Sequence, residues 1–348
     1  MVADGGPVKV HLGPRRDDRR VAGDTPERFL RSRMKNAQRL ALATCLTTLL
    51  LIAIGAYVRA SGSGLGCPDW PTCHGGVVPP GTRHSLIEFS HRFFGSVVGL
   101  LVIATAVMAW KHYRHASFTV WTATIAVPLV GIQGLLGALT VVKELPPAIV
   151  ATHLITAMLV LSFELAVLLS MYLEDPKRAS QLNAIVTTPT RGVGQLAIAA
   201  VAWLAAVMWI GGYIAESGAS TACSGWPTCN GGVLPTNDSQ EITHMVHRYL
   251  AGLFLFFIVP LVVIAWRSRT RLFWSGRIAV VLGALYAAQV AVGALNVWYT
   301  FPDLLTVAHT VIAASIWFTL VGAIILTFYV PSRAFQASLD NQPAKATA

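Results

Sequence analysis

Long apolar stretches alternate with short polar connections along most of the chain. Eight stretches run at about 39–58, 86–110, 118–140, 147–172, 193–214, 243–266, 275–298 and 303–330. Each has roughly the 20 apolar residues that a helix needs to cross a bilayer. The pattern therefore predicts an all-α integral membrane protein with eight transmembrane helices.

The second half of the chain repeats the first. Residues 67–79, CPDWPTCHGGVVP, align with residues 223–235, CSGWPTCNGGVLP, at an offset of 156, and nine of these 13 positions are identical. The same offset pairs His91 with His247, Arg92 with Arg248, Gln133 with Gln289, Gly137 with Gly293, and His153 with His309. Two pseudosymmetric four-helix bundles follow, with the same direction in the membrane because each holds an even number of spans.

The repeat divides the chain into five segments. We predict an N-terminal extension (1–38), a first four-helix unit (39–172), a linker (173–192), a second four-helix unit (193–330) and a tail (331–348). The first unit is expected to hold a substrate and the second a redox cofactor.

Composition and charge support the membrane and indicate an orientation. Of the residues, 54% are hydrophobic and 12% charged, and the mean hydropathy is +0.59. The net charge of +10 is sorted by connection and does not form a nucleic-acid-binding face: ten of 26 Lys and Arg lie in residues 1–39, and residues 214–242 contain none. By the positive-inside rule, both termini and the linker are cytoplasmic. The basic N-terminus is too acidic for a mitochondrial transit peptide, and the first apolar run resembles a span more than a cleaved signal. We expect a multi-pass protein of a bacterial plasma membrane.

Four of the ten histidines lie inside apolar spans, one each on spans two, four, six and eight: His91, His153, His247 and His309. Each lies a few residues after an outward connection, so the first two can meet near the outer leaflet, and the last two can do the same. Two imidazoles from separate helices are a common ligand set for haem iron. A lone intramembrane His more often bonds a neighbouring helix, and zinc would need more ligands than two. The repeated register favours haem.

Each unit carries two cysteines in its first outward connection. Cys67 and Cys73, and likewise Cys223 and Cys229, are separated by five residues. Outside the cytoplasm such a pair can form a structural or redox-sensitive disulfide. The same spacing would also suit a metal or a redox thiol pair. Cys45 is alone in span one and is expected in the core.

The units differ next to the first histidine. Glu88 lies one helical turn before His91, whereas the second unit has His244 at that position. Glu88 is either an interfacial carboxylate favoured by the helix N-terminus or part of a reaction site. The asymmetry makes the first unit the candidate for chemistry and the second the candidate for a redox cofactor.

Other intramembrane polar residues give weaker signals. Arg92 and Arg248 follow two histidines and would either pair with haem propionates or extend to lipid headgroups. Gln133 and Gln289 lie at a depth where they could line a pocket. Glu164 has no repeat partner and lies about 16 Å from His153 along its helix, so its role stays open.

The motifs RASGSGLGCPDWPTCHG, EFSHR, CSGWPTCNGG and HMVHR resemble the haem A synthase family of cytochrome oxidase assembly proteins. The resemblance covers about residues 40–328. It implies oxidation of the C8 methyl group of haem O to a formyl group by successive hydroxylations, which gives haem A. It also implies a haem b held by His247 and His309, and a substrate site with His91, His153 and Glu88.

Two other functions use the same histidines: a b-type cytochrome that carries electrons, and a haem transporter or chaperone. All four histidines are expected near one leaflet, whereas a carrier across the bilayer would place haems at both depths. The resemblance further implies haem O as substrate, a possible contact with haem O synthase and an electron donor that the sequence does not identify.

Overall fold

A computed structural model describes residues 26–174, 191–270 and 275–340. Its elements are α1 (Pro26–Ala60), α2 (Arg83–His112), α3 (Ser117–Val142), α4 (Pro147–Leu173), α6 (Arg191–Ser217), the short 3₁₀ helix η1 (Ala219–Thr221), α7 (Ser239–Leu253), α8 (Leu255–Arg267), α9 (Ser275–Trp298) and α10 (Asp303–Asp340). Residues 1–25 of the predicted extension, 175–190 of the predicted linker and 341–348 of the predicted tail lie outside these residues.

Eight stretches of the described helices are long and apolar enough to cross a membrane. They agree with the eight predicted spans. The sixth, Ser239–Arg267, consists of α7 and α8, which meet at Phe254. The sequence suggested no interruption there. The equivalent span of the first half is the single helix α2.

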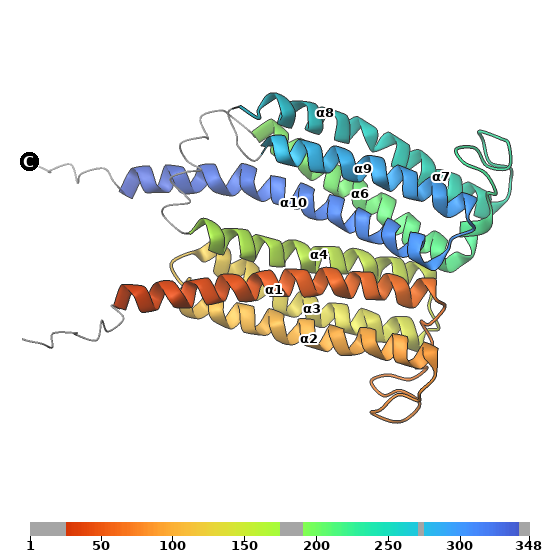
Figure 1. The fold of residues 1–348 in the computed structure, drawn as a ribbon, viewed down its shortest axis with the longest axis horizontal. Coiled ribbons are helices and arrows are strands. Elements are labelled where there is room, and N and C mark those ends of the chain that lie inside the picture. Colours follow the sequence, from red (N-terminus) through yellow and green to blue (C-terminus); the bar gives the residue numbers. More distant parts are fainter. Residues whose placement is uncertain (1–25, 175–190, 271–274, 341–348) are drawn as a thin grey trace, which may run out of the picture.

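The helices run side by side in two groups (Figure 1), α1–α4 and α6–α10. The described start of α1 and end of α10 lie at one end of the molecule, and the connections with the paired cysteines lie at the other. The groups meet where α4 packs on α6 and α10 and where α1 packs on α10.

The largest hydrophobic core lies at this junction. It includes Met158 and Leu161 of α4, Leu204 of α6 and Trp317 of α10, all buried. The indole of Trp317 also donates to the Ser162 hydroxyl at 2.8 Å. The two groups therefore share one core across their boundary.

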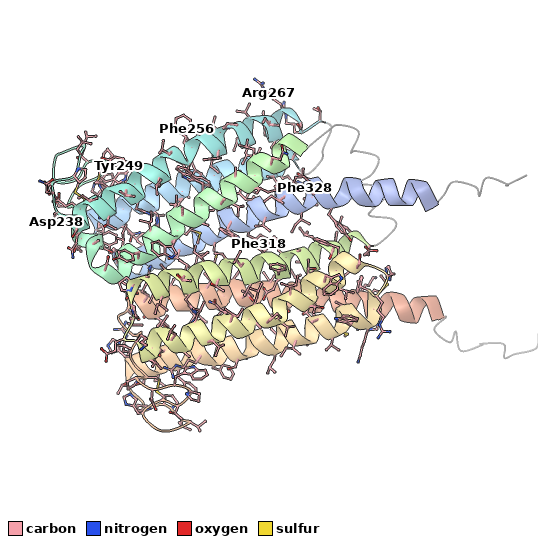
Figure 2. The ribbon with its side chains drawn as sticks, turned by 180° about the vertical axis from the view of Figure 1, so that it is seen from behind. Asp238, Tyr249, Phe256, Arg267, Phe318 and Phe328 are labelled. Atoms are coloured by element: carbon pink, nitrogen blue, oxygen red, sulfur yellow. A yellow bond between two sulfur atoms is a disulfide. The ribbon has the colours of Figure 1, made fainter. Side chains whose placement is uncertain are left out.

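Large apolar side chains also cover the outside of the helices. Phe256 of α8 is 74% exposed and lies between Asp238 and Arg267, which mark the two ends of its span in Figure 2. An apolar outer surface with polar ends is typical of a helix in contact with lipid. Polar residues inside this bundle accordingly need a specific explanation.

Helix ends show how the sequence sets the connections. Thr82 caps α2 by accepting a hydrogen bond from the Ser85 amide at 3.3 Å, and Asp238 caps α7 by accepting from the Gln240 amide at 2.7 Å. Both are favoured N-cap residues. The caps start the helices that carry His91 and His247, each nine residues or about two and a half turns later.

Candidate functional site

The first two intramembrane histidines line one cavity. His91 on α2 and His153 on α4 border a space of about 610 Å³, together with Glu88 and Arg92 of α2. This volume is typical of a small-molecule or cofactor pocket, about 300–1,000 Å³. The structure thus brings together the three residues that the sequence assigned to a substrate site.

Glycines make room for both rings. A Cβ atom on Gly55 of α1 would lie 2.9 Å from Cε1 of His91, and one on Gly137 of α3 would lie 3.2 Å from Cε1 of His153. Real Cβ atoms essentially never show the first distance, and the second is tighter than nine in ten of their contacts. Each imidazole therefore depends on a glycine of the neighbouring helix for its position.

Gln133 of α3 contacts both the ring and the backbone of His153. Its amide nitrogen lies 3.2 Å from Nε2 of His153 and donates to the His153 carbonyl oxygen at 2.9 Å. An amide nitrogen only donates, so Nε2 of His153 is unprotonated and its lone pair accepts from Gln133 in this structure. Nδ1 of His153 and Nδ1 of His91 are buried with no hydrogen-bond partner among the described residues.

The second pair of histidines repeats this packing. A Cβ on Gly211 would lie 2.9 Å from Cε1 of His247, and one on Gly293 would lie 3.1 Å from Cε1 of His309. The amide nitrogen of Gln289 lies 3.3 Å from Nε2 of His309. All three contacts are the equivalents of first-unit contacts at the offset of 156.

His247 has one contact that its equivalent lacks. Its Nδ1 lies 3.1 Å from the carbonyl oxygen of Val207. Because a carbonyl only accepts, Nδ1 carries the proton and Nε2 holds a lone pair. A second hydrogen bond of this kind orients most metal-ligating histidines. The second unit offers two imidazoles with unprotonated Nε2 atoms, which is a donor set that fits an iron porphyrin; the Nε2 of His309 accepts from Gln289 in this structure.

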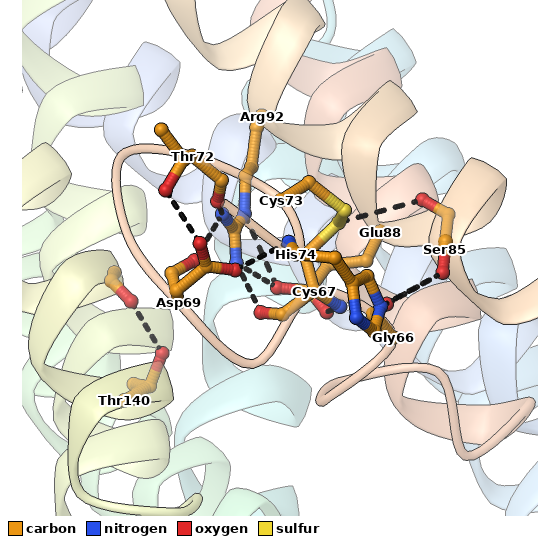
Figure 3. Close-up of polar contacts among 11 residues, drawn as sticks. Gly66, Cys67, Asp69, Thr72, Cys73, His74, Ser85, Glu88, Arg92 and Thr140 are labelled. Carbon is orange, nitrogen blue, oxygen red and sulfur yellow. Dashed lines mark hydrogen bonds and ion pairs between the residues drawn. A yellow bond between two sulfur atoms is a disulfide. The ribbon is translucent and has the colours of Figure 1, made fainter. Parts of the chain in front are cut away.

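Glu88 ties its helix to the first outward loop (Figure 3). It is 3% exposed, accepts from the Cys67 amide at 2.7 Å and pairs with Arg92 at 2.5 Å. The carboxylate therefore lies between the disulfide loop and the cavity. In the second unit, His244 occupies this position and bonds the Ala219 carbonyl through Nδ1 at 3.0 Å.

Arg92 and Arg248, which occupy equivalent positions in the two units, hold the outward loops in place. Arg92 donates to the carbonyl oxygens of Cys67, Asp69 and Thr72 at 2.7–2.8 Å (Figure 3). Arg248 donates to those of Gly225 and Thr228 at 2.8 and 3.0 Å. Contact of either arginine with haem propionates stays a prediction; the terminal nitrogens named here already have protein acceptors, whereas Nε of Arg248 has none among the described residues.

Both predicted disulfides are present, Cys67–Cys73 and Cys223–Cys229. Different residues close the two loops around them. Asp69 accepts from the Thr72 hydroxyl and the His74 amide (Figure 3). It also accepts from the Gly75 amide at 2.7 Å. These hydrogen bonds, chiefly that from Thr72, lower the pKa of Asp69 to about 2. In the second loop, Asn230 accepts from the Ser224 amide at 3.0 Å instead.

Comparison with known proteins gives a family for this arrangement. The model of the family described as "Cytochrome oxidase assembly protein" matches residues 38–86 and 82–321. The chain belongs to this family. Its similar relatives include the heme A synthase of Shouchella clausii, 35% identical over 72% of this chain and 82% of that protein. The heme A synthases of Symbiobacterium thermophilum and Bacillus cereus are 32% and 25% identical over 82% and 88% of this chain, and 93% and 98% of their own lengths.

In this member of the cytochrome oxidase assembly family, the structure adds residues that sequence reasoning missed. Arg59 of α1 and Glu216 of α6 line the same cavity as His91, although they come from different units. Neither charge is repeated, since Ala215 and Ala60 occupy the equivalent positions. A search for unrepeated charges at the ends of spans would have found both.

Proposed function

We propose that this protein oxidises the C8 methyl group of haem O to a formyl group by successive hydroxylations and so makes haem A. The observation that supports this most directly is the shared cavity of His91, His153 and Glu88. It offers two imidazoles for the iron of the substrate and one carboxylate beside them. Its size suits a bound porphyrin better than a single metal ion.

The second unit takes the other task. His247 and His309 hold a haem b, because their Nε2 atoms carry lone pairs and their rings are seated against glycines. When bound, haem b supplies one-electron redox chemistry. Electrons arrive from a donor that has no signature in the sequence.

Glu88 acts at the edge of the substrate. Its carboxylate either moves protons or stabilises positive charge that develops on the reacting carbon, and the low dielectric of the membrane strengthens both effects. Arg92 positions this carboxylate through the 2.5 Å contact. His244 gives the second unit no carboxylate at this place, which matches its role in electron transfer.

The division of the chain follows from these roles. Residues 39–172 form the substrate unit and residues 193–330 the haem b unit, and the two are pseudosymmetric four-helix bundles. Support comes from the packing of all four histidines, which repeats at the offset of 156. The extension at 1–38, the linker at 173–192 and the tail at 331–348 connect or flank them.

Both termini are cytoplasmic in this proposal, and the disulfide loops face outward. Asn237→Cys, in the second loop, should react with a membrane-impermeant thiol reagent in intact cells. Lys111→Cys, at the opposite end of the bundle, should react only after the membrane is permeabilised. The reverse labelling would invert the orientation.

Reconstitution with haem O tests the activity. The purified protein, given haem O and a reducing system, should yield the hydroxymethyl and formyl haems on extraction. Glu88→Ala and Glu88→Gln should reduce the yield about 100-fold, as for loss of a group that transfers protons. Glu144→Gln, an exposed carboxylate in another connection, is the control and should keep full activity.

The same material separates the rival functions. A b-type electron carrier or a haem transporter would return haem O unchanged. His247→Ala and His309→Ala should each remove the low-spin haem b spectrum. If that spectrum survives both substitutions, the second pair does not hold the cofactor.

A further inference from the structure

Glu164 is a buried carboxylate that the proposed reaction does not yet use. It lies inside α4 and is 4% exposed. Its Oε1 accepts a hydrogen bond from the Thr48 hydroxyl of α1 at 2.9 Å, whereas Oε2 is buried and finds no partner in the part of the chain that the structure describes. A polar atom left unsatisfied within a membrane is costly and is a candidate for function.

A small internal space borders this carboxylate. It measures about 10 Å³ and is lined by Glu164, Thr44 and Thr105, among apolar side chains. The hydroxyls of Thr44 and Thr105 are hydrogen-bonded to each other at 3.0 Å. About 10–15 Å³ is enough for one water molecule, provided that it finds two to four polar partners. The carboxylate and the two hydroxyls supply them.

Thr48 connects the carboxylate to the substrate cavity. The same residue that donates to Glu164 also lines the 610 Å³ space that contains His91 and His153. Glu164 therefore borders the small space and is joined by its Oε1 to Thr48, a residue of the cavity wall. Thr44 lies about one helical turn before Thr48 on α1.

The second unit lacks every polar member of this group. At the offset of 156, the equivalents of Thr44, Thr48, Thr105 and Glu164 are Ala200, Leu204, Leu261 and Leu320. All four are buried in the main hydrophobic core. The fold is thus built with apolar residues at these places in one copy, so packing does not require the polar group in the other.

We infer that Glu164 is a proton-exchange site that serves the substrate cavity, with Thr48 on its cavity side and a water molecule in the small space on its other side. The inference rests on the proposed function. Conversion of a methyl to a formyl group removes two of the three C–H bonds. Hydrogen is therefore released from the substrate whatever the source of the oxygen. The unit that carries this chemistry is the one that carries Glu164.

The transfers balance without an oxidant. A proton from the cavity side reaches Oε1 through the Thr48 hydroxyl, which gives its own proton to the carboxylate and takes up another. A proton then leaves the carboxyl group to the water beside Thr44 and Thr105. Each transfer breaks one O–H bond and forms one, and the electron pair stays on the oxygen that gives the proton.

Infrared difference spectroscopy on the full-length protein with haem bound tests this directly. Reduction of the haem should produce a carboxylic-acid C=O band that shifts in D₂O and is absent in Glu164→Gln and Glu164→Leu. The leucine variant installs the second-unit residue, and the glutamine variant keeps the shape and the bond from Thr48. Cys45→Ala, which alters a buried neighbour of Glu164 on α1, is the matched control and should retain the band.

Product analysis supplies the second readout. Both Glu164 variants should form haem A about tenfold more slowly or worse, with the haem b spectrum and melting temperature of the glutamine variant unchanged. Wild-type rates in Glu164→Gln, or persistence of the band, would overturn the inference. If the wild type makes no haem A, the proposed function fails; the infrared band still decides the role of Glu164 separately.

Discussion

At the scale of single residues, the four histidines are positioned by what their neighbours lack. Gly55, Gly137, Gly211 and Gly293 come from four different helices, yet each leaves the space of one methyl group beside an imidazole. Glycine inside a helix costs roughly 0.5–1 kcal/mol relative to alanine. This cost recurs beside each of the four intramembrane histidines, and in each case the glycine leaves room for the imidazole ring.

Gly55→Ala should displace His91 and leave the second unit intact. The new Cβ would lie 2.9 Å from the ring, and misplacement by about 1 Å can slow a reaction about 100-fold. Haem A formation should fall accordingly, with the haem b spectrum unchanged. Gly211→Ala should do the opposite and alter that spectrum.

Gly99→Ala is the control for both substitutions. Gly99 lies in α2, and a Cβ there meets nothing within 4 Å. Activity and spectrum should stay normal and the melting temperature should rise slightly. Normal haem A formation by Gly55→Ala would show that the cavity tolerates a displaced His91.

Asp69 makes the first disulfide loop sensitive to acid. Its pKa is lowered to about 2 by hydrogen bonds that exist only in the closed loop. A lowered pKa means that the carboxylate stabilises the loop above its usual value, near 3.8, and that this stabilisation is lost as the pH falls through about 2. Reduction of Cys67–Cys73 by a phosphine should therefore accelerate only below about pH 4.

Asp69→Asn should show the open loop at neutral pH. Faster reduction of Cys67–Cys73 is expected at pH 7, while Cys223–Cys229 reacts as before, because its loop is closed by Asn230. Mass spectrometry of alkylated peptides distinguishes the two pairs in one sample. Equal rates in wild type and variant would show that Asp69 does not control access.

At the scale of elements, the sequence predicted the features that follow from the length of the apolar runs and from the internal repeat. The eight spans followed from apolar runs, and the paired histidines and cysteines followed from the repeat. The break between α7 and α8 could not be foreseen, because the sequence is apolar on both sides of Phe254. The glycine contacts were equally hidden, since Gly55 and His91 lie on different helices.

The arginines show why side-chain partners were harder to predict than elements. Arg92 could be assigned to propionates or lipid from its place in a span. In the structure, loop carbonyls fold back over α2 and take its donors. Their direction depends on how the loop closes around Cys67–Cys73, which no local pattern in the sequence describes.

At the scale of the whole molecule, the two units share the substrate cavity. Gly212, Glu216 and Thr310 of the second unit complete a space whose other lining residues come from the first. A unit separated from its partner would therefore leave this cavity open on one side. Substrate binding is expected to depend on the junction as well as on His91 and His153.

Arg59 and Glu216 are the charges at this junction, and they should act on substrate affinity. Both line the cavity, and they lie near enough for their charges to interact. Haem O carries two propionates, and a hydrogen bond to a charged group is worth about 1.5–3 kcal/mol. Arg59→Ala should raise KM for haem O about tenfold or more with little change in kcat.

Glu216→Gln removes the competing carboxylate and should leave KM equal or lower. Arg114→Ala, at the opposite end of the bundle, should change neither constant. A KM for Arg59→Ala equal to that of wild type would mean that the propionates lie elsewhere, with the junction closing the cavity by shape alone.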